Sequence, residues 1–243
     1  MHKVPVILAA LACLGSVHPA FGHGEKGKEV PQGWSGNVAA GYVAVRGNSE
    51  STTANFKGEV QYDQDRWHHS ALATAMGASK DKDTSAEAYK AQLKTKYDLR
   101  ETVYTFGLGE WNKDRFSSYD YQIFEVAGLG WRVLRTATQE LALEAGVGAT
   151  QSRFDDGTDN NEMIGRIGMD YHWHLSENAL FSEKLSSSIG SDNTYYESLT
   201  ELKAGIIGNV ALVLGYLVKH NTDVLPGTDK TDTQTSISLE YKF

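Results

Sequence analysis

The last eleven residues of the chain, 233–243, alternate polar and apolar side chains without interruption. Successive side chains of an extended strand point to opposite faces, so Ile237, Leu239, Tyr241 and Phe243 share one face and polar residues share the other. A shift of register by one residue would exchange the two sets. This segment therefore predicts a β-strand with an apolar environment on one side and a polar environment on the other.

Strand-like patterns recur from residue 35 onward. We predict twelve strands, at residues 35–47, 51–62, 66–80, 86–99, 101–112, 118–132, 138–153, 161–174, 178–190, 194–207, 209–222 and 231–243. Most have twelve or more residues, whereas strands of ordinary globular proteins have about five or six. A tilted strand needs about 9 to 11 residues to cross a bilayer. Because polar turns separate the strands and no linker is visible, the pattern predicts an all-β fold, a single transmembrane antiparallel up-and-down β-barrel of about 12 strands.

The positions of the aromatic residues favour this fold over a soluble barrel. A soluble barrel also alternates, with its apolar residues inward, so the alternation alone leaves both folds open. If the chain enters from the periplasm, one set of aromatic residues lies near the periplasmic turns: Tyr62, Trp67, Tyr97, Tyr104, Trp131, Tyr171, Trp173, Tyr241 and Phe243. Such clustering is typical of the aromatic girdle at a bilayer interface.

Two acidic residues do not fit a simple apolar outer face. Glu125 falls on the same face as Ile123, and Glu183 falls on the same face as Phe181. A charge at the bilayer midplane would be costly. A local bulge or a neighbouring subunit would account for either residue, and the sequence leaves both explanations open.

Residues 1–22 have the features of a secretory signal peptide. Lys3 precedes an apolar run at residues 4–14, and the small residues around Gly22 fit a signal-peptidase site. The run is shorter than the roughly 18 to 20 residues that a membrane-spanning helix needs. A lipoprotein signal ending at Cys13 is an alternative, but its motif is incomplete. We therefore place cleavage after Gly22.

Cleavage there divides the chain into the signal peptide, a flexible periplasmic lead-in at residues 23–33 and the barrel at residues 34–243. The mature chain would contain no cysteine, which excludes disulfide bonds, thiolate metal sites and cysteine nucleophiles. It would carry 22 basic and 31 acidic residues, because the signal peptide contains one lysine and no acidic residue. This acidic balance argues against nucleic acid as a partner.

No catalytic or metal-binding constellation stands out. His69 and Ser70 are adjacent in one predicted strand, so they point to opposite faces and cannot activate each other for acyl transfer. Asp170, His172 and His174 share one face and could in principle ligate a metal, but a polar lining near a barrel rim is the simpler interpretation. We expect no catalytic residue, no metal, no cofactor and no enzyme activity.

Several short motifs carry a family resemblance: Trp34-Ser35-Gly36, Gly41-Tyr42, the segment 46–52, and the last strand with its terminal Phe243. With these motifs the chain resembles the YdiY-like family of outer-membrane β-barrel proteins, which is described as salt-induced and contains a domain of unknown function. The resemblance implies an outer-membrane location and a link to ionic or acid stress, and it supplies no catalytic residues. A final strand ending in Phe also resembles the closing strand of bacterial outer-membrane barrels, which implies contact with the barrel-assembly machinery.

Two functions are favoured about equally: a narrow channel for ions or small solutes, and a non-conducting structural or stress-responsive envelope barrel. An outer-membrane lipid-modifying enzyme is a more distant alternative. The expected partners are outer-membrane lipid and, through Phe243, the barrel-assembly machinery. Strand parity predicts lumen-facing charges of both signs, at Lys57, Glu59, Lys90, Lys94, Lys96, Asp98, Glu140, Glu144, Arg166, Asp170, Glu240 and Lys242. Because unpaired charges inside a narrow barrel are costly, we expect cross-strand ion pairs, a constricted lumen and a low conductance with weak charge selectivity.

Overall fold

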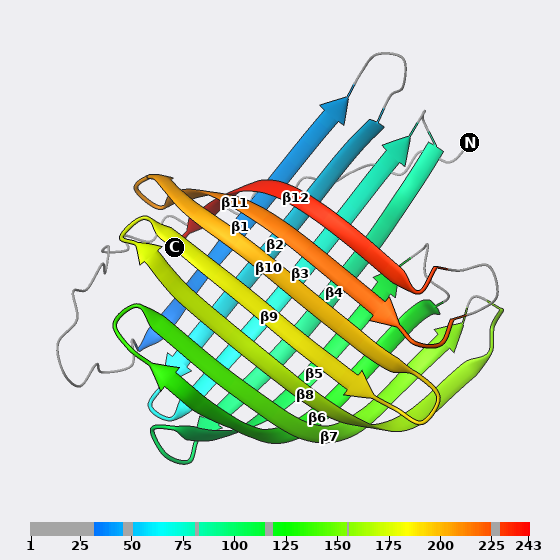
Figure 1. Cartoon of the computed structure of the whole chain (residues 1–243), viewed down its shortest axis with the longest axis horizontal. Coiled ribbons are helices and arrows are strands. Elements are labelled where there is room, and N and C mark those ends of the chain that lie inside the picture. The colour runs from blue at the N-terminus through cyan, green and yellow to red at the C-terminus, as the bar shows by residue number, and fades with distance from the viewer. Residues whose placement is uncertain (1–31, 46–50, 81–82, 115–118, 155, 225–228) are drawn as a thin grey trace.

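The computed structural model describes residues 32–45, 51–80, 83–114, 119–154, 156–224 and 229–243. Within these residues the chain forms twelve antiparallel strands that close into one barrel (Figure 1). The strands are β1 (Gly33–Val45), β2 (Ser51–Gln64), β3 (Trp67–Lys80), β4 (Asp83–Asp98), β5 (Val103–Asp114), β6 (Tyr119–Arg135), β7 (Gln139–Phe154), β8 (Asp159–Ser176), β9 (Ala179–Ile189), β10 (Thr194–Ile207), β11 (Val210–Asn221) and β12 (Thr231–Lys242). The predicted twelve-stranded up-and-down barrel is confirmed, with strand ends that differ by at most three residues from the prediction.

Each strand pairs with its neighbours in sequence, and β1 pairs with β12. We call the end of the barrel that holds Gly33 and Phe243 the terminal end, and the opposite end the distal end. The connections that follow β2, β4, β6, β8 and β10 lie at the terminal end, because the chain crosses the barrel twice between them. The predicted signal peptide at 1–22 and nearly all of the lead-in at 23–33 lie outside the described residues.

The apolar faces of the strands point outward and most polar faces point inward. On β4, Leu93 is 67% exposed, whereas its neighbours Gln92 and Lys94 line the interior. On β12, Leu239 is exposed and Glu240 is buried. The hydrophobic effect would not leave such a face in water, so an apolar exterior is the arrangement of a barrel that spans a bilayer. Among the described residues, no α-helix combines the length and apolar character needed for a membrane span.

Most outward aromatic side chains lie at two levels of the barrel, and the exposed Phe56 lies one step inside the distal level. Exposed residues at the terminal level are Trp34, Trp67, Trp131, Trp173, Tyr241 and Phe243, and those at the distal level are Tyr42, Tyr89, Trp111, Tyr196 and Tyr216. Trp34 and Tyr42 are eight residues apart on β1, or about 26 Å along the strand. Allowing for a tilt of 35–45°, the two levels are on the order of 20 Å apart, which is comparable with the apolar band of transmembrane barrels.

Tyr104 does not belong to the terminal aromatic level, so this part of the prediction is wrong. Its side chain points inward and is only 1% exposed. The ring lies against Gly130 of β6, where a Cβ atom would overlap it. Tyr104 is adjacent to a terminal turn, but its parity on β5 places it inside the barrel.

The interior is apolar along one wall. Seven buried residues of β5, β6, β8 and β10 form a cluster inside the barrel: Tyr104, Phe106, Leu108, Phe124, Val126, Ile164 and Tyr195. They interrupt the polar inner face that the rest of the barrel shows. These large apolar side chains fill the part of the lumen next to this wall.

The first and last strands close the barrel over a short distance. Gly36 and Phe243 exchange two backbone hydrogen bonds, each 2.9 Å long. A Cβ atom at Gly36 would collide with the Phe243 ring, so the glycine makes room for the terminal aromatic residue. In the described part of the chain, the ladder beyond this pair covers only four residue pairs, ending at Ala40 and Leu239. The other ladders of the barrel are longer.

The two acidic residues on the outer face lie one step inside the aromatic levels. On the outer face of β6, Glu125 lies between Ile123 and Ala127. Ile123 is the ladder partner of Trp111, which belongs to the distal level. No register shift separates Glu125 from these neighbours, so it faces outward. Its position near the interface lowers the cost of an outward charge, because this cost falls with distance from the midplane.

Glu183 has a second source of stabilisation. It follows Phe181, the ladder partner of Trp173 at the terminal level. The hydroxyl groups of Ser198 and Thr200 donate hydrogen bonds of 2.8 and 2.5 Å to its two carboxylate oxygens. Glu183 therefore faces outward with both oxygens satisfied by β10.

Candidate functional site

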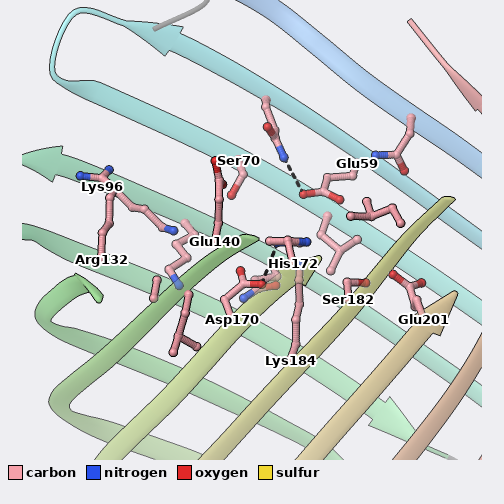
Figure 2. Close-up of a pocket in the computed structure, with 18 of the residues that line it drawn as sticks. Glu59, Ser70, Lys96, Arg132, Glu140, Asp170, His172, Ser182, Lys184 and Glu201 are labelled. Atoms are coloured by element: carbon pink, nitrogen blue, oxygen red, sulfur yellow. Dashed lines mark hydrogen bonds and ion pairs between the residues drawn. The ribbon is translucent and has the colours of Figure 1, made fainter. Parts of the chain in front are cut away.

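A cavity of about 500 Å³ occupies the terminal half of the lumen, and we call it the terminal chamber. Side chains from β1 to β10 line it, so it lies inside the barrel and not between two neighbouring strands. Figure 2 shows the labelled residues pointing into one space from opposite walls, with Glu59 on one side and Asp170, His172 and Lys184 on the other. A chamber with charges of both signs can hold water and small polar solutes.

Ion pairs cross the chamber from wall to wall. Lys57 Nζ of β2 lies 2.8 Å from Glu201 Oε1 of β10. Lys94 Nζ of β4 lies 2.5 Å from Glu144 Oε2 of β7, and Lys96 Nζ lies 3.7 Å from Glu144 Oε1. Since these strands are not adjacent in the barrel, the pairs bridge the lumen instead of lying flat on its wall.

Tyr104 contacts the same Glu144 carboxylate as the two lysines. Its hydroxyl group donates a 2.7 Å hydrogen bond to Glu144 Oε1. The Lys96 ammonium lies 4.9 Å from the centre of the Tyr104 ring, and the Arg132 guanidinium lies 4.8 Å from it. Both cations are therefore placed for cation–π contact with a buried ring.

A second network lines the mouth of the chamber. Arg132 Nη2 lies 2.7 Å from Asp98 Oδ1. His68 Nδ1 lies 2.7 Å from Asp63 Oδ1, and its Nε2 lies 3.2 Å from Asp98 Oδ2. One imidazole ring thus connects the ends of β2 and β4, and the arginine extends the network to β6.

Lys184 is a cation of the chamber that lacks a direct ion pair. Among the described residues, no carboxylate lies within 4.0 Å of its ammonium group, although Asp170, Glu59 and Glu201 all attract it electrostatically. Asp170 Oδ1 is instead 2.9 Å from His172 Nε2.

Beyond the chamber, the middle of the barrel is closed by a group of residues that we call the central cluster: Lys90, Glu110, Arg166, Tyr195 and Glu197. Lys90 Nζ lies 2.6 Å from Glu197 Oε1 and 3.5 Å from Glu110 Oε1. The Tyr195 hydroxyl donates a 2.7 Å hydrogen bond to Glu197 Oε2.

Arg166 completes the central cluster. Its Nη2 lies 3.9 Å from Glu110 Oε2, and its guanidinium donates hydrogen bonds to Ser188 and Ser186 at 2.9 and 3.2 Å. The Glu110 side chain is only 2% exposed. Two cations and two carboxylates from four strands therefore neutralise one another in the middle of the lumen.

A much smaller cavity lies on the distal side of the central cluster. Its volume is about 10 Å³, roughly the space of one water molecule. Phe124, Ile164 and Tyr195 line it and also belong to the buried apolar cluster. Along the described part of the lumen, the terminal chamber is thus followed by the central cluster and then by this small cavity.

The structure places the predicted lumen residues as follows. Six pair across the lumen or in the central cluster: Lys57, Lys90, Lys94, Lys96, Glu144 and Arg166. Three form other ion pairs of the interior: Asp98, Asp170 and Glu240. Glu59 and Glu140 line the chamber and have no cation within 4.0 Å among the described residues, and Lys242 is exposed at the terminal rim. Glu240 pairs with Lys203 at 2.7 Å.

Several partners in these networks were not predicted from the sequence: Asp63, His68, Glu110, Arg132, Lys184, Tyr195, Glu197, Glu201 and Lys203. A signal was present for β10, where Tyr195, Glu197, Glu201 and Lys203 are separated by even numbers of residues and so share one face. Arg132 and Glu110 offered no comparable signal, because their strands carry apolar residues on both faces.

The described residues contain no group of three or more His, Cys, Asp or Glu side chains placed to hold a metal ion. His68 and His172 contact carboxylates, and His69 contacts the Thr95 hydroxyl at 3.1 Å. In this part of the chain no hydrogen bond joins a serine hydroxyl to a histidine. The arrangement suits electrostatic binding of small polar species.

A closed twelve-stranded barrel with an apolar exterior and a charged lumen belongs to the class of transmembrane β-barrels that includes bacterial channels and porins. The fold is similar to that of the NanC porin, with a TM-score of 0.52 and 11% identity over 86% of this chain and 100% of that chain. It is also similar to the COG4313 outer membrane channel from Pseudomonas putida F1, with a TM-score of 0.53 and 10% identity over 94% of this chain and 100% of that chain. At such identities the likeness concerns the fold alone.

The chain belongs to the family "Protein of unknown function, DUF481", whose model matches residues 38–243. It is similar to the "Uncharacterized protein YdiY" of Escherichia coli (strain K12), with 26% identity over 211 residues, which cover 86% of this chain and 83% of the relative. The resemblance to the YdiY-like family is thus confirmed.

Proposed function

We propose that the protein is an outer-membrane barrel that acts as a narrow channel of low conductance for ions and small polar solutes. The observation that carries this proposal is the division of the lumen into a terminal chamber of about 500 Å³ and a central cluster in which Lys90 bridges Glu110 and Glu197. Chamber walls of mixed charge favour hydrated ions of either sign, and the central cluster is the constriction that they must pass. The fold shared with a porin and an outer membrane channel supports the same class of function.

Planar bilayer recordings of the purified, refolded protein test this proposal. Wild-type barrels should give small, weakly selective conductance steps. The double variant Lys90→Ala/Glu197→Ala should increase the step size, because it removes the side chains that bridge the lumen and leaves Glu110 with Arg166. Lys80→Ala is the matched control, since Lys80 is exposed at the distal end of β3, and it should leave the step size unchanged.

A non-conducting envelope barrel is the second candidate, and the buried apolar cluster inside the lumen favours it. If neither the wild type nor the double variant conducts, although both retain the heat-modifiable migration of a folded barrel, the channel proposal is wrong and this candidate stands. If the wild type and the double variant conduct equally, the central cluster is not the constriction.

The proposal includes the route to the outer membrane. Residues 1–22 would direct secretion, and the final strand with Phe243 would engage the barrel-assembly machinery and then outer-membrane lipid. Deletion of Phe243 should reduce the folded barrel in outer-membrane fractions, because it also removes both hydrogen bonds to Gly36. A link to salt stress is a separate part of the proposal, and protein levels at raised salt concentration would test it.

A further inference from the structure

The charges that line the terminal chamber are separated by sign. The charged residues of β4, β5 and β6 in its lining are all cations, and we call them the cationic wall: Lys94, Lys96, Arg132 and Arg135. The carboxylates of the lining come from β2, β7, β8 and β10: Glu59, Glu140, Asp170 and Glu201. Figure 2 shows Lys96 and Arg132 on one side of the space, with Glu59 and Glu201 on the other side.

Opposite the cationic wall, Glu59 and Asp170 are left without a lysine or arginine partner. The other carboxylates there form short ion pairs: Glu201 with Lys57 at 2.8 Å, and Glu240 with Lys203 at 2.7 Å. Among the described residues, no Lys or Arg nitrogen lies within 4.0 Å of Glu59 or Asp170. Lys184 attracts both carboxylates, but one ammonium group cannot neutralise two of them. This side of the chamber therefore keeps an excess of negative charge.

Two buried oxygen atoms on this side also lack a hydrogen-bond donor. They are Asn37 Oδ1 and Asp170 Oδ1, and neither has a hydrogen-bond partner among the described residues. His172 Nε2 is 2.9 Å from Asp170 Oδ1, but it does not lie in the direction that a hydrogen bond requires. Asn37 is the ladder partner of Glu59, so its oxygen belongs to the same side of the chamber. Because unsatisfied buried acceptors are unfavourable, these oxygens favour a ligand that carries N–H groups.

The cationic wall has free capacity for an anionic group. Lys94 Nζ lies 2.5 Å from Glu144 Oε2, whereas Lys96 Nζ lies 3.7 Å from the other oxygen of the same carboxylate. Arg135 has no carboxylate within 4.0 Å in the described part of the chain. A carboxylate can therefore approach Lys96 and Arg135 without displacing a short ion pair.

The space between the two sides suits a small molecule with an apolar part. Its volume of about 500 Å³ lies within the range of pockets that bind small molecules. Leu72 and Leu180 also line the chamber. Leu72 is the ladder partner of Glu59, and Leu180 lies on the same face of β9 as Lys184. An aliphatic group can thus pack beside the carboxylates while polar groups at its end reach both sides.

We propose that the terminal chamber is a binding site for small zwitterions that carry a carboxylate and a primary ammonium group, which is the chemical class of the aliphatic amino acids. The ammonium group donates to Asp170 and Asn37 beside Glu59, and the carboxylate faces Lys96 of the cationic wall. The site rests on the proposed function and deepens it, because it names the class of solute that the channel admits. A molecule with a single charge complements only one side of the chamber, so it binds more weakly.

Three ligands with the same aliphatic chain test this proposal. L-leucine carries both charged groups, 4-methylpentanoate lacks the ammonium group, and 3-methylbutylamine lacks the carboxylate. Binding is measured by isothermal titration calorimetry on wild-type barrels in nanodiscs of neutral phosphatidylcholine, with the heat of empty nanodiscs subtracted. We expect saturable binding of L-leucine, and binding of each single-charge analogue that is weaker by about tenfold or more, since each analogue loses hydrogen bonds to charged groups.

Two variants locate the two ends of the ligand. Asp170→Asn should weaken the binding of L-leucine and 3-methylbutylamine by about tenfold or more, and it should not weaken 4-methylpentanoate. Lys96→Met should weaken L-leucine and 4-methylpentanoate, and it should not weaken 3-methylbutylamine. Asp83→Asn and Lys80→Met are the matched controls, because they change the same charges at exposed positions of the distal end and should leave all three affinities unchanged.

Heat for L-leucine equal to that of empty nanodiscs would overturn the proposal. Equal affinities for L-leucine and either analogue would also overturn it, because one side of the chamber would then contribute nothing. If a variant does not fold, the three ligands on the wild type still decide. Planar bilayer recordings separate this site from the proposed function: leucine binding without conductance supports the site and contradicts the channel, whereas conductance without leucine binding contradicts the site and leaves the channel standing.

Discussion

Lys90 Nζ and Glu197 Oε1 lie 2.6 Å apart in the middle of the barrel, although the two residues are separated by 107 positions in the sequence. Neither strand is adjacent to the other, since β4 and β10 lie on opposite sides of the lumen. A pair of this kind holds two opposite walls of the lumen at a fixed distance, and its two charges neutralise each other. Both side chains are largely shielded from solvent, with 15% and 17% of their surface exposed.

Replacing Lys90 with Met should therefore destabilise the barrel strongly. The change leaves Glu197 without its cation and deprives Glu110 of one of its two, which at a buried site costs about 3–5 kcal/mol in the free energy of unfolding. Urea unfolding in detergent micelles, followed by tryptophan fluorescence, measures this loss. Lys90→Met/Glu197→Gln should lose less than Lys90→Met alone, and an equal or larger loss in the double variant would contradict the importance of the pair.

Cysteine labelling should separate the two faces of β4. Leu93→Cys lies on the outer face and should react only with a maleimide that partitions into the bilayer. Gln92→Cys lines the terminal chamber and should react with a small water-soluble maleimide. Mass spectrometry of barrels in liposomes measures both reactions. The reverse pattern would place the apolar face inside and would contradict a transmembrane barrel.

Gly130→Ala should destabilise the barrel, because the new methyl group would overlap the buried Tyr104 ring. Overpacking of this type costs about 1–3 kcal/mol. Gly165→Ala is the matched control, since nothing lies within 4 Å of its Cβ position. The difference between the two variants in urea unfolding reports the overlap. Equal stabilities would show that the Tyr104 ring moves aside without cost.

Thr200→Val should destabilise the barrel through Glu183. The substitution removes the hydrogen bond to one carboxylate oxygen and leaves that oxygen unsatisfied on the outer face, at a cost of about 1–3 kcal/mol. In the background of Glu183→Gln the same substitution should cost clearly less, because the acceptor is no longer charged. A double-mutant cycle of unfolding free energies tests this coupling, and additive effects would contradict it.

The fold could be predicted from the sequence because it depends on a local pattern. Strand length and alternation are properties of consecutive residues, and all twelve strands follow from them. The prediction is wrong for Tyr104 because strand parity, and not proximity to a turn, decides whether a side chain faces the membrane or the lumen. On β5 and β6 parity itself was ambiguous: Phe106 and Phe124 face inward while other large apolar residues of the same strands face outward.

The candidate site could also be predicted only in part, but the reason differs from the one that applies to Tyr104. Alternation assigns Lys90, Lys94 and Glu144 to one face, but it does not tell which residue of a distant strand lies opposite. Contacts across a lumen depend on strand number, shear and tilt, which the whole barrel sets together. Glu197 and Glu201 therefore became partners of Lys90 and Lys57 through the geometry of the closed barrel and not through any spacing in the sequence.

The two outward carboxylates also act as depth markers. Glu125 lies one step inside the distal aromatic level, and Glu183 lies one step inside the terminal level. If the barrel slid along the membrane normal in one direction, Glu125 would move deeper into the hydrocarbon, and sliding in the other direction would move Glu183 deeper. A thicker bilayer would cover both. The barrel is therefore matched to one immersion depth and to a narrow range of membrane thickness.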